Sequence, residues 1–211
     1  DGRVLSALEP GRHRRGDHVE LPCERPMDVA TAVYVEGIAM RICIVGSGVV
    51  GLATAVGLKR QGHDVVCHDT SLERRQALEA DGWEVIAALS DAGECDVFFI
   101  CVPTPPAPEG FDLSYVRVAT QAVRDLLKRQ SCPVVAVRST VLPGTMRRVV
   151  LPVLEGDGRT LGRDFGLCYD PEFLRAATAL DDLLHPPLTV VGEFDGRSAD
   201  VVAQLHEPFG A

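Results

Sequence analysis

The sequence predicts an α/β domain with a doubly wound, mostly parallel sheet and helices on both faces. Two observations predict this fold. From Met40 onward, short apolar runs alternate with segments of helical periodicity, which is the order of repeated βαβ units. A glycine-rich stretch, GSGVVG at residues 46–51, then stands directly between the first apolar run and the first helical segment. The alternating pattern begins at Met40, so we expect the folded domain to cover residues 40–211.

Residues 1–39 have a different character. They contain three prolines and several glycines, show little sustained periodicity and begin without a methionine. Their five arginines face seven acidic residues, which is more typical of a solvated segment than of a binding arm. We expect residues 1–39 to be a poorly ordered extension, with 28–35 as the one candidate for regular structure.

Strands are expected where apolar runs are bounded by turn residues. In chain order these runs are residues 41–45, 64–68, 83–86 (the weakest), 96–102, 133–137, 165–169 and 188–191. Helices are expected between them, and the proline-rich segment 103–108 is expected to be a loop.

Three of the helical segments have clear signals. In residues 112–130 the apolar positions follow i, i+3, i+7 spacing behind Asp112, a candidate cap, so one face can pack on the sheet. A similar pattern runs from Met146 to Val153 after Pro143, and proline suits a first helical turn. The last helix, residues 197–207, is ended by Pro208.

Composition limits the partners of the protein. Lys and Arg number 21 against 30 Asp and Glu, so the formal net charge of −9 repels nucleic acid and anionic membranes. No stretch approaches the roughly 20 apolar residues of a membrane span, and the N-terminus lacks the order of a signal peptide. We therefore expect a cytoplasmic protein that binds neither nucleic acid nor a membrane.

The cysteines and histidines do not indicate a metal. The cysteines number seven, without a Cys-x-x-Cys pair, and most lie in or beside expected strands, where a thiol acts as a small hydrophobe. They are Cys23, Cys43, Cys67, Cys95, Cys101, Cys132 and Cys168. The six histidines never stand at i, i+4, so each is expected to be a surface or packing residue. We predict no metal site and a reducing compartment.

The glycine-rich stretch predicts a dinucleotide site because Gly46, Gly48 and Gly51 form G-x-G-x-x-G between a strand and a helix. The first glycine permits a tight turn, the second lets a pyrophosphate approach the backbone, and the third lets the helix pack closely on the strand. The helix N-terminus then offers unpaired N–H groups and a partial positive charge to the phosphates. The alternative is a glycine-rich turn that binds nothing.

Asp69 completes this pattern. It lies 18 residues after Gly51, at the end of the second expected strand, where a carboxylate can accept hydrogen bonds from the adenosine ribose. The same carboxylate would repel a 2′-phosphate, so NAD is favoured over NADP. Arg74 and Arg75 weaken this preference, since an arginine here could receive the extra phosphate.

Polar residues also follow three later strands. They lie in CVPTPP (101–106), RSTVLPGT (138–145) and DPEFLRAATALDD (170–182). Ligands of open parallel sheets bind outside the carboxyl ends of the strands. Each residue alone would be read as a cap or turn residue, but their common edge predicts that they converge with the glycine turn. The residues concerned are Thr104, Ser139, Thr140 and Glu172.

From Met40 to its end the chain resembles the N-terminal, NAD-binding domain of the UDP-glucose/GDP-mannose dehydrogenase family. The stretches that carry the resemblance are MRICIVGSGVVGLATAVGL, GHDVVCHD, FFICVPTPP, DLSYV, VRSTVLPGT, DFGLCYDPEFLRAATALDD and TVVGEFD. Of these, RSTVLPGT and PEFLR look somewhat closer to the GDP-mannose enzymes.

The resemblance implies a set of site residues. Those expected to contact NAD are Val49, Val50, Asp69, Arg74, Thr104 and Thr140. Glu172 is expected near the nicotinamide, where it and Thr140 would position a water or relay a proton. The residues expected beside the UDP- or GDP-linked sugar are Phe173, Leu174 and Arg175.

The family's reaction requires a cysteine that is not recognised in this chain. The sugar C6 alcohol is oxidised twice, through an aldehyde captured by a cysteine, to a thioester that water releases, with one NAD consumed in each oxidation. That cysteine lies in a glycine-rich motif of a later domain, and none of the seven cysteines here has that context. The helix that usually forms the homodimer is also later. We expect a fragment that binds NAD but cannot complete turnover alone.

Three departures and two alternatives qualify the resemblance. Ala176 stands where the family commonly has a glutamate, Asp170 where it has asparagine, and the stretch between Asp69 and Asp96 is shorter.

The chain could instead be a stand-alone NAD-binding module. It could also be the Rossmann domain of a β-hydroxyacid-type dehydrogenase.

Overall fold

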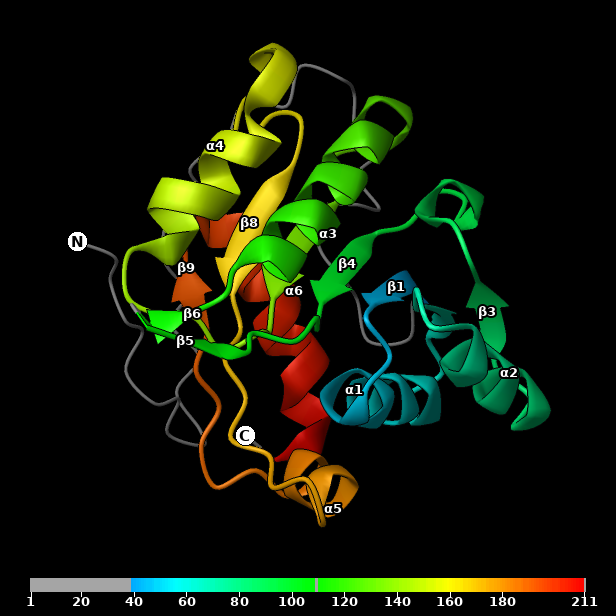
Figure 1. Ribbon diagram of the computed structural model, residues 1–211. Coiled ribbons are helices and arrows are strands. Elements are labelled where there is room, and N and C mark those ends of the chain that lie inside the picture. The colour runs from blue at the N-terminus through cyan, green and yellow to red at the C-terminus, as the bar shows by residue number, and fades with distance from the viewer. Residues whose placement is uncertain (1–38, 109, 211) are drawn as a thin grey trace.

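The computed structural model describes residues 39–108 and 110–210 (Figure 1). The expected extension, with its candidate element at 28–35, lies outside these residues except for Ala39. The main sheet has seven strands in the order β3-β2-β1-β4-β7-β8-β9. Neighbouring strands are parallel except β9, which runs antiparallel to β8. The predicted fold class is confirmed.

Most expected strands form where the apolar runs predicted them. They are β1 (Arg41–Val45), β2 (Asp64–His68), β3 (Glu84–Ile86), β4 (Val97–Ile100), β7 (Val134–Val137) and β8 (Gly166–Tyr169). Every residue of β4 and β7 is buried, because helices cover both faces of the sheet there. The last four of these strands are shorter than their apolar runs, by between one and three residues.

Two predictions were wrong. The strand expected at 188–191 is instead β9 (Gly192–Glu193), which pairs with Cys168 and Tyr169 of β8. The apolar run before it reflects packing, since Val191 is buried in the core without strand pairing. The segment 103–108 is not only a loop, because β5 (Pro106–Ala107) and β6 (Gly110–Phe111) form a small antiparallel hairpin.

The helices divide between the two faces of the sheet. On one face lie α3 (Ser114–Leu126) and α4 (Leu151–Leu154), the latter preceded by a π-helical turn at Met146–Val150 (Figure 1). On the other lie α1 (Val49–Arg60), α2 (Leu72–Ala80) and α6 (Gly196–His206). No helix in the part of the chain that the structure describes is long and apolar enough to cross a membrane.

The strands alternate their side chains between two cores, as the pleat requires. In β4, Phe98 and Ile100 enter the core under α3 and α4, while Val97 and Phe99 enter the core under α1 and α6. A third, smaller cluster joins α1 to α5 (Ala179–Leu184) near the carboxyl end of α6.

The sheet order places a crevice beside the glycine turn. The chain runs outward from β1 to β2 and β3, and then returns to β4 on the other side of β1. In such sheets the ligand crevice lies at the carboxyl ends of the two strands where the order reverses, here β1 and β4. Gly46, with φ of +93°, turns the chain there, and an added Cβ would stand 3.0 Å from the Cys101 backbone.

Gly51 and Gly48 should respond differently to alanine. A Cβ at Gly51 would overlap the Gly46 carbonyl oxygen, whereas at Gly48 it would meet nothing within 4 Å. We expect Gly51→Ala to lower the free energy of unfolding by about 1–3 kcal/mol, as overpacking does. We expect Gly48→Ala to lower it less, by about 0.5–1 kcal/mol, because glycine is preferred over alanine at a helix N-cap. Urea unfolding of both variants tests this, and equal effects would contradict the close packing of α1 on the turn.

Candidate dinucleotide-binding site

The turn after β1 is fastened to the end of β2 through Ser47, which is fully buried. Its N–H donates to Asp69 Oδ2 at 3.0 Å, and its hydroxyl donates to the His68 carbonyl at 3.2 Å. Its carbonyl accepts a hydrogen bond from Arg74 Nε at 2.6 Å, and the Gly46 N–H also donates to His68, at 2.9 Å. The polar groups of Ser47 are therefore used within the protein and fix the turn.

The first turn of α1 presents amides without such partners. Gly48 occupies the cap position without a side-chain hydrogen bond, and its carbonyl accepts the Leu52 N–H at 2.9 Å. The amides of Gly48, Val49 and Val50 precede the first intrahelical bond, so no carbonyl of the helix can accept from them. Gly48 and Val49 are exposed. This is the arrangement that binds phosphate at helix N-termini.

Asp69 points at this turn. Besides the Ser47 amide on Oδ2, its Oδ1 accepts the Ser71 N–H at 2.9 Å. Each carboxylate oxygen keeps a second acceptor position, so the side chain can still receive ribose hydroxyls. Arg75 donates to the carbonyls of Asp69 and Thr70 at 2.9 Å each, which supports the backbone at the same point.

Polar residues predicted from the later loops lie at the same edge, at the ends of β4, β7 and β8. Thr104 and Glu172 are half-buried and Thr140 is exposed. Ser139 is different, because it is buried and its hydroxyl donates to the Val102 carbonyl at 2.7 Å. Ser139 therefore ties two loops together and is not free for a ligand.

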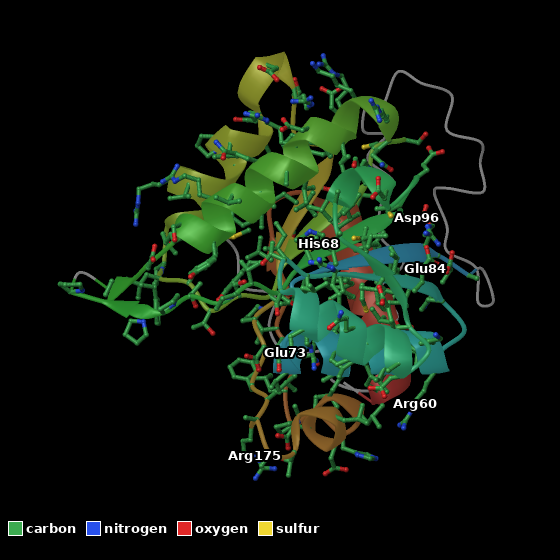
Figure 2. The ribbon with its side chains drawn as sticks, turned by 45° about the vertical axis from the view of Figure 1, so that its right-hand side comes forward. Arg60, His68, Glu73, Glu84, Asp96 and Arg175 are labelled. Atoms are coloured by element: carbon green, nitrogen blue, oxygen red, sulfur yellow. The ribbon has the colours of Figure 1, made fainter. Side chains whose placement is uncertain are left out.

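The segment expected beside the sugar nucleotide divides in two. Glu172, Phe173 and Leu174 line a small hollow between residues 170–174 and 182–189. Glu172 accepts the Leu174 N–H, and Phe173 is 54% exposed. Arg175 does not line this hollow; it pairs with Asp182 at 2.6 Å and projects from the end of the molecule beside α5 (Figure 2).

A buried charged cluster, which was not predicted from the sequence, lies at the same hollow. Arg138 follows β7 and Asp170 follows β8, and the preceding residues, Val137 and Tyr169, are register partners. Arg138 and Asp170 form an ion pair, and His206 Nε2 lies 3.1 Å from both carboxylate oxygens of Asp170. His206 is thus more than a packing residue. Opposite charges directly after two adjacent buried strands were the signal available in the sequence.

The pKa of Asp170 is set by this cluster. Burial alone would raise it, but the Arg138 cation and His206 together hold it below its ordinary value. A carboxyl group whose pKa is lower in the folded than in the unfolded protein stabilises the folded state at pH values above its unfolded pKa. This stabilisation is lost as the pH falls through its pKa in the folded protein.

We expect this contribution to be visible in a comparison of the parent with Asp170→Asn. The difference in their free energies of unfolding should be largest near neutral pH. It should shrink below about pH 4, where Asp170 of the unfolded chain takes up a proton. Chemical unfolding between pH 3 and 7 measures this. A difference that does not change with pH would contradict a buried carboxylate charge.

No cysteine in the described residues resembles an activated nucleophile at this edge. Cys101 follows β4 directly, and burial raises the pKa of its thiol to about 12. It therefore stays protonated near neutral pH, and a thiol is a poor nucleophile. In the same part of the chain, no group of three or more His, Cys, Asp or Glu residues is placed to hold a metal ion.

The comparison with known proteins decides the family. The sequence profile described as "UDP-glucose/GDP-mannose dehydrogenase family, NAD binding domain" matches residues 40–89 and 84–210. The chain belongs to this family. The two matches overlap at residues 84–89, inside the stretch between Asp69 and Asp96 that was expected to be shorter than in the family. In the structure this stretch forms α2 and β3, and β3 pairs with β2.

Relatives and solved structures agree with this assignment. The chain is 37% identical over 196 residues to GDP-mannose 6-dehydrogenase of Pseudomonas syringae pv. tomato, covering 82% of this chain and 45% of the relative. It is 31% identical over 191 residues to the UDP-glucose 6-dehydrogenase AglM of Haloferax volcanii, covering 80% and 44%. A ternary complex of GDP-mannose dehydrogenase from Pseudomonas aeruginosa superposes with a TM-score of 0.73 at 33% identity, covering 80% and 44%. The chain thus spans less than half the length of these nucleotide-sugar dehydrogenases.

Proposed function

We propose that this NAD-binding domain holds the cofactor along the carboxyl edge of the sheet. Its pyrophosphate lies on the amides of Gly48, Val49 and Val50, and its adenosine ribose bonds to Asp69. The observation that carries the proposal is the Ser47–Asp69 hydrogen bond, because it holds the phosphate-binding amides and the ribose acceptor in one rigid unit. Arg74, bonded to the Ser47 carbonyl, supports the same unit.

The nicotinamide then extends toward Thr104, Thr140 and Glu172. Parallel strands bring these three side chains to the edge where the sheet order reverses. A carboxylate and a hydroxyl here can orient water or move a proton beside the ring. Phe173 and Leu174 line the adjacent hollow, which supports a contact between them and the sugar nucleotide. Arg175 could join them only by exchanging Asp182 for a ligand.

We further propose that this chain is the cofactor-binding part of a nucleotide-sugar 6-dehydrogenase. Identity is higher to the GDP-mannose enzyme of Pseudomonas syringae, at 37%, than to the UDP-glucose enzyme of Haloferax volcanii, at 31%, which favours GDP-mannose as the substrate. The raised pKa of Cys101 supports the expectation that the 211-residue chain alone does not complete the thioester chemistry.

Calorimetric titration of the 211-residue chain tests the cofactor proposal. We expect NAD to bind, NADP to bind at least about tenfold more weakly because Asp69 repels the 2′-phosphate, and sugar nucleotides to bind little. No reduction of NAD is expected with GDP-mannose or UDP-glucose. Asp69→Ala should weaken NAD about tenfold or more, the scale of a lost charged hydrogen bond. An unchanged NAD affinity in this variant would remove Asp69 from the site.

Gly48→Ala separates binding from folding. The added methyl group has space in the protein but would stand where the pyrophosphate approaches. We expect NAD affinity to fall about tenfold or more with little loss of stability, since a misplaced phosphate loses at least one charge-assisted hydrogen bond. Val118→Ala, at a 65% exposed position on α3, is the matched control and should leave NAD affinity unchanged. Equal affinities in the two variants would place the phosphates elsewhere.

A further inference from the structure

The buried cluster of Arg138, Asp170 and His206 joins three elements of the fold. Arg138 follows β7, Asp170 follows β8, and His206 is the last residue of α6. Their exposed fractions are 3%, 1% and 7%. The Asp170 carboxylate bonds to the Arg138 guanidinium and to His206 Nε2, and Arg138 Nη1 lies 3.3 Å from the same histidine nitrogen.

Because the cluster is buried, its three side chains cannot easily be separated. Separating the partners would leave a charge in a low-dielectric interior without compensation, which is strongly destabilising. Arg138 Nε already has no hydrogen-bond partner among the described residues, so the guanidinium depends heavily on Asp170. The segments that leave β7 and β8 therefore cannot shift independently of each other.

These two segments carry the residues proposed to face the nicotinamide. Thr140 comes two residues after Arg138, and Glu172 comes two residues after Asp170. Backbone bonds between the strand ends continue as far as Ser139. The Asp170 N–H donates to the Val137 carbonyl at 2.9 Å, and the N–H groups of Arg138 and Ser139 donate to the Ile100 carbonyl at 2.9 and 3.2 Å. The Ser139 side chain is also tied to Val102, while Thr140 is exposed.

We propose that the cluster of Arg138, Asp170 and His206 positions the loops that carry Thr140 and Glu172, and so fixes the geometry at the nicotinamide end of the cofactor. None of the three needs to touch the cofactor for this role. The proposal rests on the proposed function, because it assumes that NAD lies along this edge with its nicotinamide toward Thr140 and Glu172.

A purely stabilising role predicts a different result. If the cluster only adds stability, a variant that stays folded should bind NAD and ADP with unchanged relative affinity. If it positions the nicotinamide end, NAD should lose affinity while ADP, which occupies only the glycine turn and Asp69, should not. The ratio of NAD to ADP affinity therefore separates the two roles.

The test uses the 211-residue chain with Arg138→Met and Asp170→Asn together. Both charges are removed at once and replaced by neutral groups of similar size, so no unpaired charge remains buried. We expect the variant to stay folded and to bind ADP as the parent does. The NAD-to-ADP affinity ratio should fall about fivefold or more, the scale of one lost hydrogen bond. Amide hydrogen exchange should become faster in residues 138–145 and 170–176.

Two further comparisons guard against indirect effects. Glu84→Gln breaks the Arg41–Glu84 ion pair near Asp96, at the opposite edge of the sheet (Figure 2), and should leave the ratio unchanged. His206→Gln keeps a donor that can face Asp170 and should retain the parent ratio, whereas His206→Leu should lower it. Rescue by the glutamine would identify the hydrogen bond to Asp170 as the contribution of His206.

Each outcome decides the proposal. A folded double variant with an unchanged NAD-to-ADP ratio and unchanged exchange in both loops would overturn the positioning role. If the parent binds neither nucleotide, the proposed function fails. In that case the amide hydrogen exchange of the double variant still tests the cluster. Faster exchange in the two loops would show that the cluster holds them, and unchanged exchange would overturn the positioning role.

Discussion

The hydrogen bond from the Ser47 amide to the Asp69 carboxylate is the constraint on which the rest of the site depends. It joins the turn after β1 to the end of β2, together with the hydrogen bonds from the Ser47 hydroxyl and the Gly46 N–H to the His68 carbonyl. Because Ser47 is buried and uses its N–H, hydroxyl and carbonyl within the protein, the turn cannot rotate to satisfy a ligand. The next amides, from Gly48 onward, are therefore held open toward the crevice.

The same principle recurs at the other end of the proposed cofactor path. There, Arg138 and Asp170 join the ends of β7 and β8 as Ser47 and Asp69 join the ends of β1 and β2. In both places a polar contact with at least one fully buried partner connects adjacent parallel strands just before a loop of the proposed site. A parallel sheet supplies the common edge, and these contacts fix how the loops leave it. In the proposed function, the adenosine and nicotinamide ends are thereby positioned separately.

Much of this could be predicted from the sequence, because the strongest signals are local. Gly46, Gly48 and Gly51 between a strand and a helix predict the turn, and uniformly apolar runs predict the central strands. The strand expected at 188–191 was wrong because Val191 is buried by packing without strand pairing, while Leu188 lines the hollow and is 43% exposed. An apolar run does not distinguish these roles from strand pairing. The role of His206 depends on a contact 36 residues away along the chain, so no local pattern carried it.

The most direct test of the account is an NMR titration of the ¹⁵N-labelled chain with NAD. The amides of Gly48, Val49 and Val50 should show the largest changes in chemical shift. ADP should reproduce these changes, because the diphosphate is the part that reaches these groups. Changes that spare these three amides while the cofactor binds would contradict the central claim that the N-terminus of α1 receives the pyrophosphate.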